Sequence, residues 1–189
     1  MEKIKLGFAL CGSFCTFSEI MNVYRSLADK YELYPIMSEN SAHTDTRFGK
    51  AENFREILEE YSGREIIDNI VAAEPMGPKK LLDALVIAPC TGNTLAKLAD
   101  GIADSSVTLA AKAHLRNERP LIIAVSTNDG LGANAQNIGR LMARKHIYMV
   151  PFKQDSPFHK TRSLVADFSL IDECVRKALQ GEQMQPMLT

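Results

Sequence analysis

Short, continuous runs of apolar residues alternate along the chain with longer stretches that are apolar on one side only. The runs lack the polar–apolar alternation of a half-exposed strand, and this is typical of strands buried on both faces of a parallel sheet. They predict five strands, over residues 4–10, 32–37, 84–88, 120–125 and 147–150.

The stretches between the strands predict helices. Thr16-Phe17-Ser18-Glu19 fits a capping box that opens a helix ending near residue 30. The apolar spacing from Leu164 to Leu179 predicts a C-terminal helix over 163–180, followed by a polar tail that we expect to fray. The other predicted helices cover residues 50–61, 64–73, 95–102 and 135–142.

This order of elements predicts the fold class. Strand and helix alternate about five times, which favours a doubly wound α/β fold with right-handed crossovers. We expect a Rossmann-like, mainly parallel sheet of five or six strands in the flavodoxin-like order 2-1-3-4-5, between two layers of helices. A length of 189 residues without an internal repeat or linker predicts one domain over residues 1–189.

Composition and charge narrow the class of protein. A net charge of −1 argues against a broad nucleic-acid interface. The apolar run after Lys3 and Lys5 imitates a signal peptide, but it is too short to span a bilayer and no cleavage site follows, so we expect a cytoplasmic protein. The four cysteines form no Cys-x-x-Cys pair, and they predict free thiols rather than a metal site.

The loops that follow the first four strands are rich in hydroxyls, amides and glycines. In such sheets ligands bind beyond the carboxyl ends of the strands, where glycine and helix N-termini suit a phosphate group. Helix caps and turns would explain each loop taken singly. The loops are Cys11-Gly12-Ser13-Phe14, Ser38-Glu39-Asn40-Ser41, Pro89-Cys90-Thr91-Gly92-Asn93-Thr94 and Ser126-Thr127-Asn128-Asp129-Gly130.

Common nucleotide and hydrolase motifs are absent from these loops. The sequence has no Gly-x-Gly-x-x-Gly after the first strand, no P-loop and no Gly-x-Ser-x-Gly elbow. Cys11 and Cys90 end neighbouring strands, where they form either a nucleophilic pair or buried packing. Residues 151–162 are polar and irregular, and they form either a mobile lid over an anionic substrate or a solvated connector.

Residues 88–104, together with Gly12-Ser13 and Ser38, resemble the flavoprotein family of FMN-binding cysteine decarboxylases. Residues 88–104 read Ala-Pro-Cys-Thr-Gly-Asn-Thr-Leu-Ala-Lys-Leu-Ala-Asp-Gly-Ile-Ala-Asp, against a family pattern of Ala-Pro-x-Ser/Thr-x-Asn-Thr, Ala-Lys and Gly-x-x-Asp. The resemblance implies FMN as cofactor and a trimer-based homo-oligomer. It implies a cofactor-binding set of Gly12, Ser13, Phe14, Ser38, Thr91, Asn93, Thr94 and Thr108.

Within this family the chain most closely resembles the B subunits of dipicolinate synthases, through residues 8–13, 38–46, 126–132 and 150–158. This resemblance implies oxidation of a dihydrodipicolinate-type precursor to dipicolinate in the mother-cell cytoplasm of a sporulating bacterium. It implies a dehydrogenase-like A subunit, which supplies NAD(P) and without which the B subunit does not turn over. For the small dicarboxylate substrate we expect Asn128 and Lys153 as catalytic residues and Asn128, Lys160 and Arg162 as binding residues.

Two departures from the family pattern keep other functions open. The catalytic histidine of the decarboxylases would fall at Pro75, and no histidine lies between His43 and His114. The family's Pro-x-Met-Asn loop is replaced by Ser126-Thr127-Asn128-Asp129. The alternatives are an FMN-dependent decarboxylase of a cysteinyl acid and a non-catalytic binding subunit.

Overall fold

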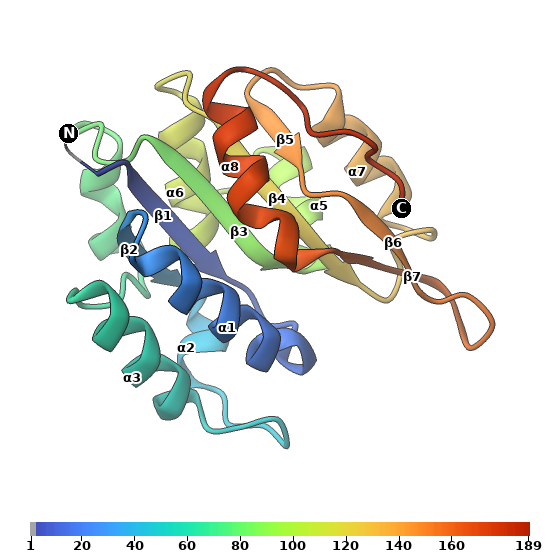
Figure 1. Cartoon of the computed structure of the whole chain (residues 1–189), viewed down its shortest axis with the longest axis horizontal. Helices are drawn as coiled ribbons and strands as arrows, with labels where there is room; N and C mark the ends of the chain where they lie inside the picture. The colour runs from blue at the N-terminus through green and yellow to red at the C-terminus, as the bar shows by residue number, and fades with distance from the viewer. Residues whose placement is uncertain (1–2) are drawn as a thin grey trace.

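The five predicted strands form the parallel part of one sheet in the computed structural model, which describes residues 3–189 (Figure 1). They run parallel in the order β2-β1-β3-β4-β5, so the predicted fold class and strand order are confirmed. The strands are β1 (Lys5–Leu10), β2 (Glu32–Met37), β3 (Ala84–Cys90), β4 (Leu121–Thr127) and β5 (Ile147–Met149).

Helices cover both faces of the sheet, which explains why the central strands are apolar on both sides. All seven residues of β3 are buried. On one face lie α1 (Phe17–Ala28), α3 (Ala51–Ser62) and α8 (Ile171–Leu179) (Figure 1). On the other lie α4 (Ile70–Ala73), α5 (Gly92–Asp100), α6 (Ser106–Leu115) and α7 (Ala135–Met142), and the short α2 (Glu39–His43) follows β2 (Figure 1). None of the helices within residues 3–189 has the length and apolar character that a membrane span requires.

A hairpin replaces the irregular segment that we expected at residues 151–162. Its strands are β6 (Phe152–Ser156) and β7 (Lys160–Ala166), and β7 pairs antiparallel with the end of β4. The hairpin raises the described sheet to seven strands, and its tip projects beyond the rest of the molecule (Figure 1). The hairpin could not be predicted from the sequence, because the residues of its outer half are exposed and form no apolar face.

The C-terminal helix is shorter than the predicted range 163–180. It begins at Ile171, because Leu164 and Ala166 belong to β7 and Asp167 then caps a 3-10 turn. The tail after Gly181 is also bonded rather than frayed. The Gln183 side chain bonds both main-chain groups of Met149, each at 2.8 Å, and the tail pairs with Phe152 further on.

One other predicted helix start and one predicted helix cap are wrong, although α1 itself begins where it was predicted. Of residues 64–73 only Ile70–Ala73 is helical, because the main chain of Ile67 bonds to the edge strand β2 at Pro35 and Met37. The capping box before α1 does not form either. The Thr16 hydroxyl instead donates to the Ser13 carbonyl at 2.8 Å, within a 3-10 turn over Phe14–Thr16. That turn fixes the loop that carries Ser13.

Candidate functional site

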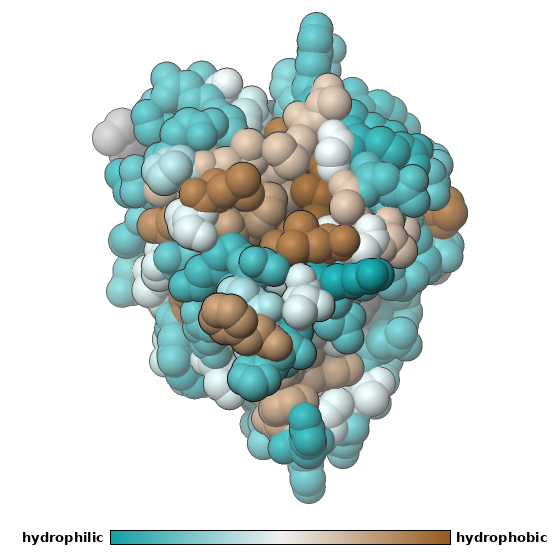
Figure 2. All heavy atoms as spheres, turned by 90° about the vertical axis from the view of Figure 1, so that its right-hand side faces the viewer, coloured by the Kyte–Doolittle hydropathy of each residue, from teal (hydrophilic) through white to brown (hydrophobic). Residues whose placement is uncertain are grey.

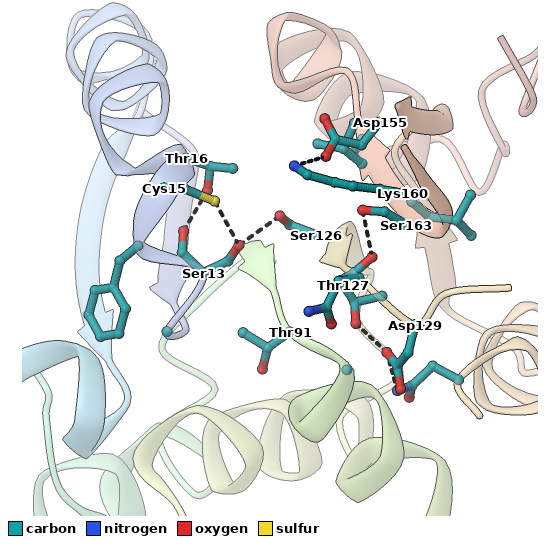
Figure 3. Close-up of a pocket in the computed structure, with 18 of the residues that line it drawn as sticks. Ser13, Cys15, Thr16, Thr91, Ser126, Thr127, Asp129, Asp155, Lys160 and Ser163 are labelled. Atoms are coloured by element: carbon teal, nitrogen blue, oxygen red, sulfur yellow. Dashed lines mark hydrogen bonds and ion pairs between the residues drawn. The ribbon is translucent and has the colours of Figure 1, made fainter. Parts of the chain in front are cut away.

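A cavity of about 1200 Å³ opens where β1, β3 and β4 end (Figure 3). Its walls come from the loops that follow these three strands and from the β6–β7 hairpin. This is the edge at which parallel α/β sheets bind ligands, as the sequence predicted. Side chains from elements far apart in the chain therefore meet around one space.

Two serine hydroxyls join the β1 and β4 sides of the cavity. Ser13 Oγ and Ser126 Oγ lie 2.8 Å apart, and Cys15 Sγ lies 4.0 Å from Ser13 Oγ (Figure 3). A serine hydroxyl has one proton, and one of the two serines uses its proton in this bond, so the other serine can still donate to a ligand oxygen. Gly12 and the Phe14 ring complete this wall, which offers hydroxyl groups beside an apolar ring.

The floor of the cavity is the start of α5. Thr91 caps this helix, since its Oγ1 accepts a bond from the Thr94 main-chain N–H at 3.3 Å. Thr94 turns away from the cavity and donates to Cys11 Sγ at 3.2 Å. Burial raises the pKa of the Cys11 thiol to about 11 and that of Cys90 well above its usual value, so both are neutral near pH 7. The two cysteines therefore act as buried packing.

A carboxylate network lies on the β4 side of the floor. The Asn134 amide donates to Asp129 Oδ1 at 2.9 Å and to Oδ2 at 2.8 Å, and Thr127 Oγ1 donates to Oδ1 as well. A Cβ on Gly92 would lie within 3 Å of all three side chains, so the network rests directly on the first turn of α5. A larger residue than glycine at position 92 would displace it.

The hairpin wall carries cationic groups. Lys160 Nζ lies 2.6 Å from Asp155 Oδ2, and this hydrogen bond raises the pKa of Lys160 (Figure 3). Lys153 lines the same wall, and within residues 3–189 no carboxylate lies within ion-pair distance of its Nζ. Arg47 and Phe48 approach from the loop before α3, with the guanidinium 4.8 Å from the ring centroid. These cations suit carboxylate or phosphate groups.

The structure brings some of the sequence candidates together and places others outside the cavity. Those that line it are Gly12, Ser13, Phe14, Thr91, Asn93, Asn128, Lys153 and Lys160. The Ser38 hydroxyl caps α2, Thr94 faces Cys11, Thr108 forms a capping box with Ser105, and the Arg162 carbonyl accepts a bond from Leu131.

Several residues of the cavity carry no clear signal in the sequence. Arg47 lies in a polar loop with no periodic pattern, and the turn after β4 separates Asn134 from Asp129 by five positions. The loop containing Asp129 was predicted to face the site, but nothing in its sequence indicates that its carboxylate is held there. Among the described residues, no histidine lines the cavity and no group of three or more His, Cys, Asp or Glu side chains could hold a metal ion.

The fold agrees with comparisons to known proteins. The family model described as Flavoprotein matches residues 1–177, and the chain belongs to this family. The chain is 45% identical to the B subunit of dipicolinate synthase from Bacillus subtilis (strain 168) over 185 residues, which cover 97% of this chain and 92% of that one. The resemblance found in the sequence is therefore confirmed.

Solved structures of related proteins have the same fold. The crystal structure of the dipicolinate synthase B subunit from Bacillus halodurans matches with a TM-score of 0.90 and 42% identity, covering 100% of this chain and 98% of that one. The FMN-dependent cysteine decarboxylase SpaF matches with a TM-score of 0.67 and 24% identity, covering 93% and 97%. At that identity SpaF shows a shared fold and carries no further conclusion about this chain.

Proposed function

We propose that this chain is the B-type subunit of an enzyme that oxidises a dihydrodipicolinate-type precursor to dipicolinate during sporulation. The similarity to two dipicolinate synthase B subunits supports this proposal. The observation that carries it is the cavity itself, in which the hydroxyls of Ser13 and Ser126 face a wall that carries Lys153 and Lys160. Such a cavity suits a small ligand with two carboxylates next to a phosphate-bearing cofactor.

The residues present fit FMN. Beside Gly12, the Ser13–Ser126 pair offers a hydroxyl hydrogen for a phosphate, and Thr91 and Asn93 add polar groups at the start of α5. The Phe14 ring provides a flat apolar surface for an aromatic ring system. FMN, when bound, supplies a two-electron acceptor for the oxidation.

The hairpin wall is the part of the cavity proposed to hold the substrate. Lys153 and Lys160 would each bind a carboxylate, and Asn128 would donate an amide hydrogen bond. Lys160 would exchange its bond to Asp155 for one to the substrate. Asn128 and Lys153 are proposed to orient the ring for reaction, whereas Arg162, on the same hairpin, lies outside the cavity and is left out of the proposed site.

A dehydrogenase-like A subunit, carrying NAD(P), is proposed as the partner, and a trimer-based oligomer as the assembly, both in the mother-cell cytoplasm. Exposed apolar side chains support contacts with other chains, because large apolar patches mark interfaces. Phe158 at the hairpin tip is 93% exposed, Leu188 71% and Leu131 51%. Figure 2 shows the face that lies on the right-hand side of Figure 1, where apolar residues gather in the middle with hydrophilic residues around them.

Titration of the purified protein with FMN, followed by flavin fluorescence, tests the cofactor. We expect stoichiometric binding by the wild type, a loss of about tenfold in affinity for Ser13→Ala, and wild-type affinity for Ser26→Ala on the exposed side of α1. An unchanged affinity in Ser13→Ala would contradict the placement of FMN.

Turnover assays then separate the proposed function from its two alternatives. Dipicolinate should form only when the A subunit is added. Full activity of the purified chain alone would contradict the need for a partner. Release of carbon dioxide from a thiol-bearing acid would favour the decarboxylase. Complex formation with a dehydrogenase, without flavin binding, would favour a non-catalytic subunit.

A further inference from the structure

Asp129 is the carboxylate at the α5 end of the cavity, and its neighbours fix its orientation. Asn134 donates to both of its oxygens, and Thr127 donates to Oδ1. Asn137 donates in turn to Asn134 Oδ1 at 2.9 Å, and both asparagines are buried. A carboxylate offers about four lone-pair positions, and these bonds use two on Oδ1 and one on Oδ2. Asp129 is half-buried and lines the cavity, so its Oδ2 can accept a hydrogen bond from a bound molecule.

The cations of the hairpin and the Asp129 carboxylate lie on two sides of the same cavity. Val165 of β7 pairs with Lys153 of β6 on one side and with Ser126 of β4 on the other. Lys153 therefore lies two strand spacings, about 10 Å, from the end of β4, and Asp129 follows in the loop after β4. Figure 3 shows Lys160 on the hairpin and Asp129 beyond the end of β4. A ligand that spans the two sides meets cations at one end and a carboxylate at the other.

This arrangement decides which end of a dicarboxylate ring faces Asp129. Within residues 3–189 no lysine, arginine or histidine nitrogen lies within ion-pair distance of Asp129. Ligand carboxylates are therefore attracted by Lys153 and Lys160 and repelled by Asp129. In a ring 2,6-dicarboxylate the nitrogen lies between the carboxylates and faces the lysines with them. The ring atom opposite the nitrogen faces Asp129, and a bare C–H bond there would cover Oδ2 without giving it a hydrogen bond.

We propose that Asp129 accepts a hydrogen bond from a hydroxyl group on the ring atom opposite the nitrogen, and so selects a hydrated form of the dihydrodipicolinate-type precursor. The proposal rests on the proposed function. A hydroxyl supplies the donor that Oδ2 lacks, and it leaves the ring without an oxidant. In that loss the C–O bond and a C–H bond on the neighbouring ring carbon break, a ring C=C bond forms, and hydroxide and proton leave as water. In the oxidation that follows, the dihydro ring gives a hydride to the flavin or nicotinamide acceptor and a proton to solvent.

This assignment gives Asp129 a second effect, on product release. The aromatic product has only a C–H bond at the ring position opposite the nitrogen, so it makes no hydrogen bond to Asp129. A hydrogen bond to a charged group changes affinity about 10- to 100-fold. Asp129 therefore favours the hydroxylated ring over the product, and the loss of water weakens the hold of the site on the ring.

Calorimetric binding of three benzene-1,3-dicarboxylates to the full chain at pH 7, with FMN added, tests this directly. Their ring position 5 corresponds to the atom opposite the nitrogen, and the absence of a ring nitrogen removes differences in its protonation. The three compounds carry hydrogen, methyl or hydroxyl at position 5, and the methyl group matches the hydroxyl in size but cannot donate.

The wild type should bind the hydroxyl compound at least about tenfold more tightly than the methyl compound. In Asp129→Asn this ratio should fall to about threefold or less, because the hydrogen bond loses its charge assistance. Asp29→Asn, an exposed change at the far end of α1, should keep the wild-type ratio. Lys153→Met should weaken the binding of all three compounds and leave the ratio unchanged.

The outcomes distinguish this inference from the function on which it rests. Equal affinities of the wild type for the hydroxyl and methyl compounds, or a preference for methyl, would overturn the role of Asp129 and leave the dicarboxylate site standing. Binding of none of the three compounds would overturn both. A ratio that Asp129→Asn preserves, or a loss of all three compounds in that variant, would overturn the assignment to this residue. Unchanged affinities in Lys153→Met would place the carboxylates elsewhere, and would overturn the orientation on which the inference depends.

Discussion

Replacement of Gly92 by alanine tests whether the Asp129 network is as tightly packed on α5 as its geometry indicates. The added Cβ would lie 2.4 Å from Asn134 Nδ2, 2.7 Å from Thr127 Oγ1 and 2.8 Å from Asp129 Oδ1. The three side chains hold one another by hydrogen bonds, so none can move alone. The backbone of Gly92 lies outside the left-handed region, which makes the expected cost steric.

The size of the effect follows from the contacts. Overpacking of this kind costs about 1–3 kcal/mol, and alanine at a helix start returns at most about 1 kcal/mol. Gly139 in α7 is the matched control, because its added Cβ would meet nothing within 4 Å. Gly139→Ala should stabilise the protein by about 0.5–1 kcal/mol.

Urea denaturation of the two variants and the wild type measures these free energies of unfolding. We expect Gly92→Ala to lie about 2 kcal/mol below Gly139→Ala in its free energy of unfolding. Equal stability of the two variants would refute the packing of the network on Gly92.

Two further predictions concern groups outside this network. Burial lowers the pKa of His114 from 6.5 to about 4. As the pH falls below 6.5, His114 therefore binds a proton in the unfolded chain before it does so in the folded chain. The free energy of unfolding should fall by about 3 kcal/mol between pH 6.5 and pH 4. His114→Gln, which can still donate to the Pro120 carbonyl, should flatten this part of the stability curve in urea denaturation, and parallel curves would contradict the reasoning. Cys15 is the one exposed cysteine of the four, so a thiol reagent should label one thiol in the native protein and all four after denaturation. Bound FMN should slow that labelling, because Cys15 lines the cavity.

The sheet could be predicted from the sequence because burial on both faces leaves a continuous apolar pattern. β2 was predicted to the residue, and the ends of the other four strands lie within a few positions of their predicted limits. The hairpin could not be predicted in the same way. Leu164, in its second strand, lies four positions before Phe168, which is the spacing of a helix face, and the outer residues of the hairpin are exposed and polar.

The site was predictable by topology but not by side-chain direction. Gly12, Thr91 and Asn93 line the cavity because strand ends in a parallel sheet meet at one edge. Ser38 lies in a loop of the same composition and Thr108 in the first turn of α6, yet both hydroxyls are used in helix caps. A hydroxyl that caps a helix and one that faces a ligand occupy the same sequence position, next to a helix start, so composition cannot separate them.

The hairpin that the sequence did not predict matters most for the site, because β4 pairs with β5 along one part of its length and with β7 along another. The first half of β4 pairs with β5, and its last residues, Ser126 and Thr127, pair with β7. The Ser163 hydroxyl donates to the Thr127 carbonyl at 3.3 Å, and Leu131 donates to the Arg162 carbonyl at 2.9 Å, so the loop carrying Asp129 is tied to the hairpin on both sides. The position of the loop that carries Asp129 is therefore coupled to the position of the hairpin by these bonds, although the two segments lie more than 30 residues apart in the chain.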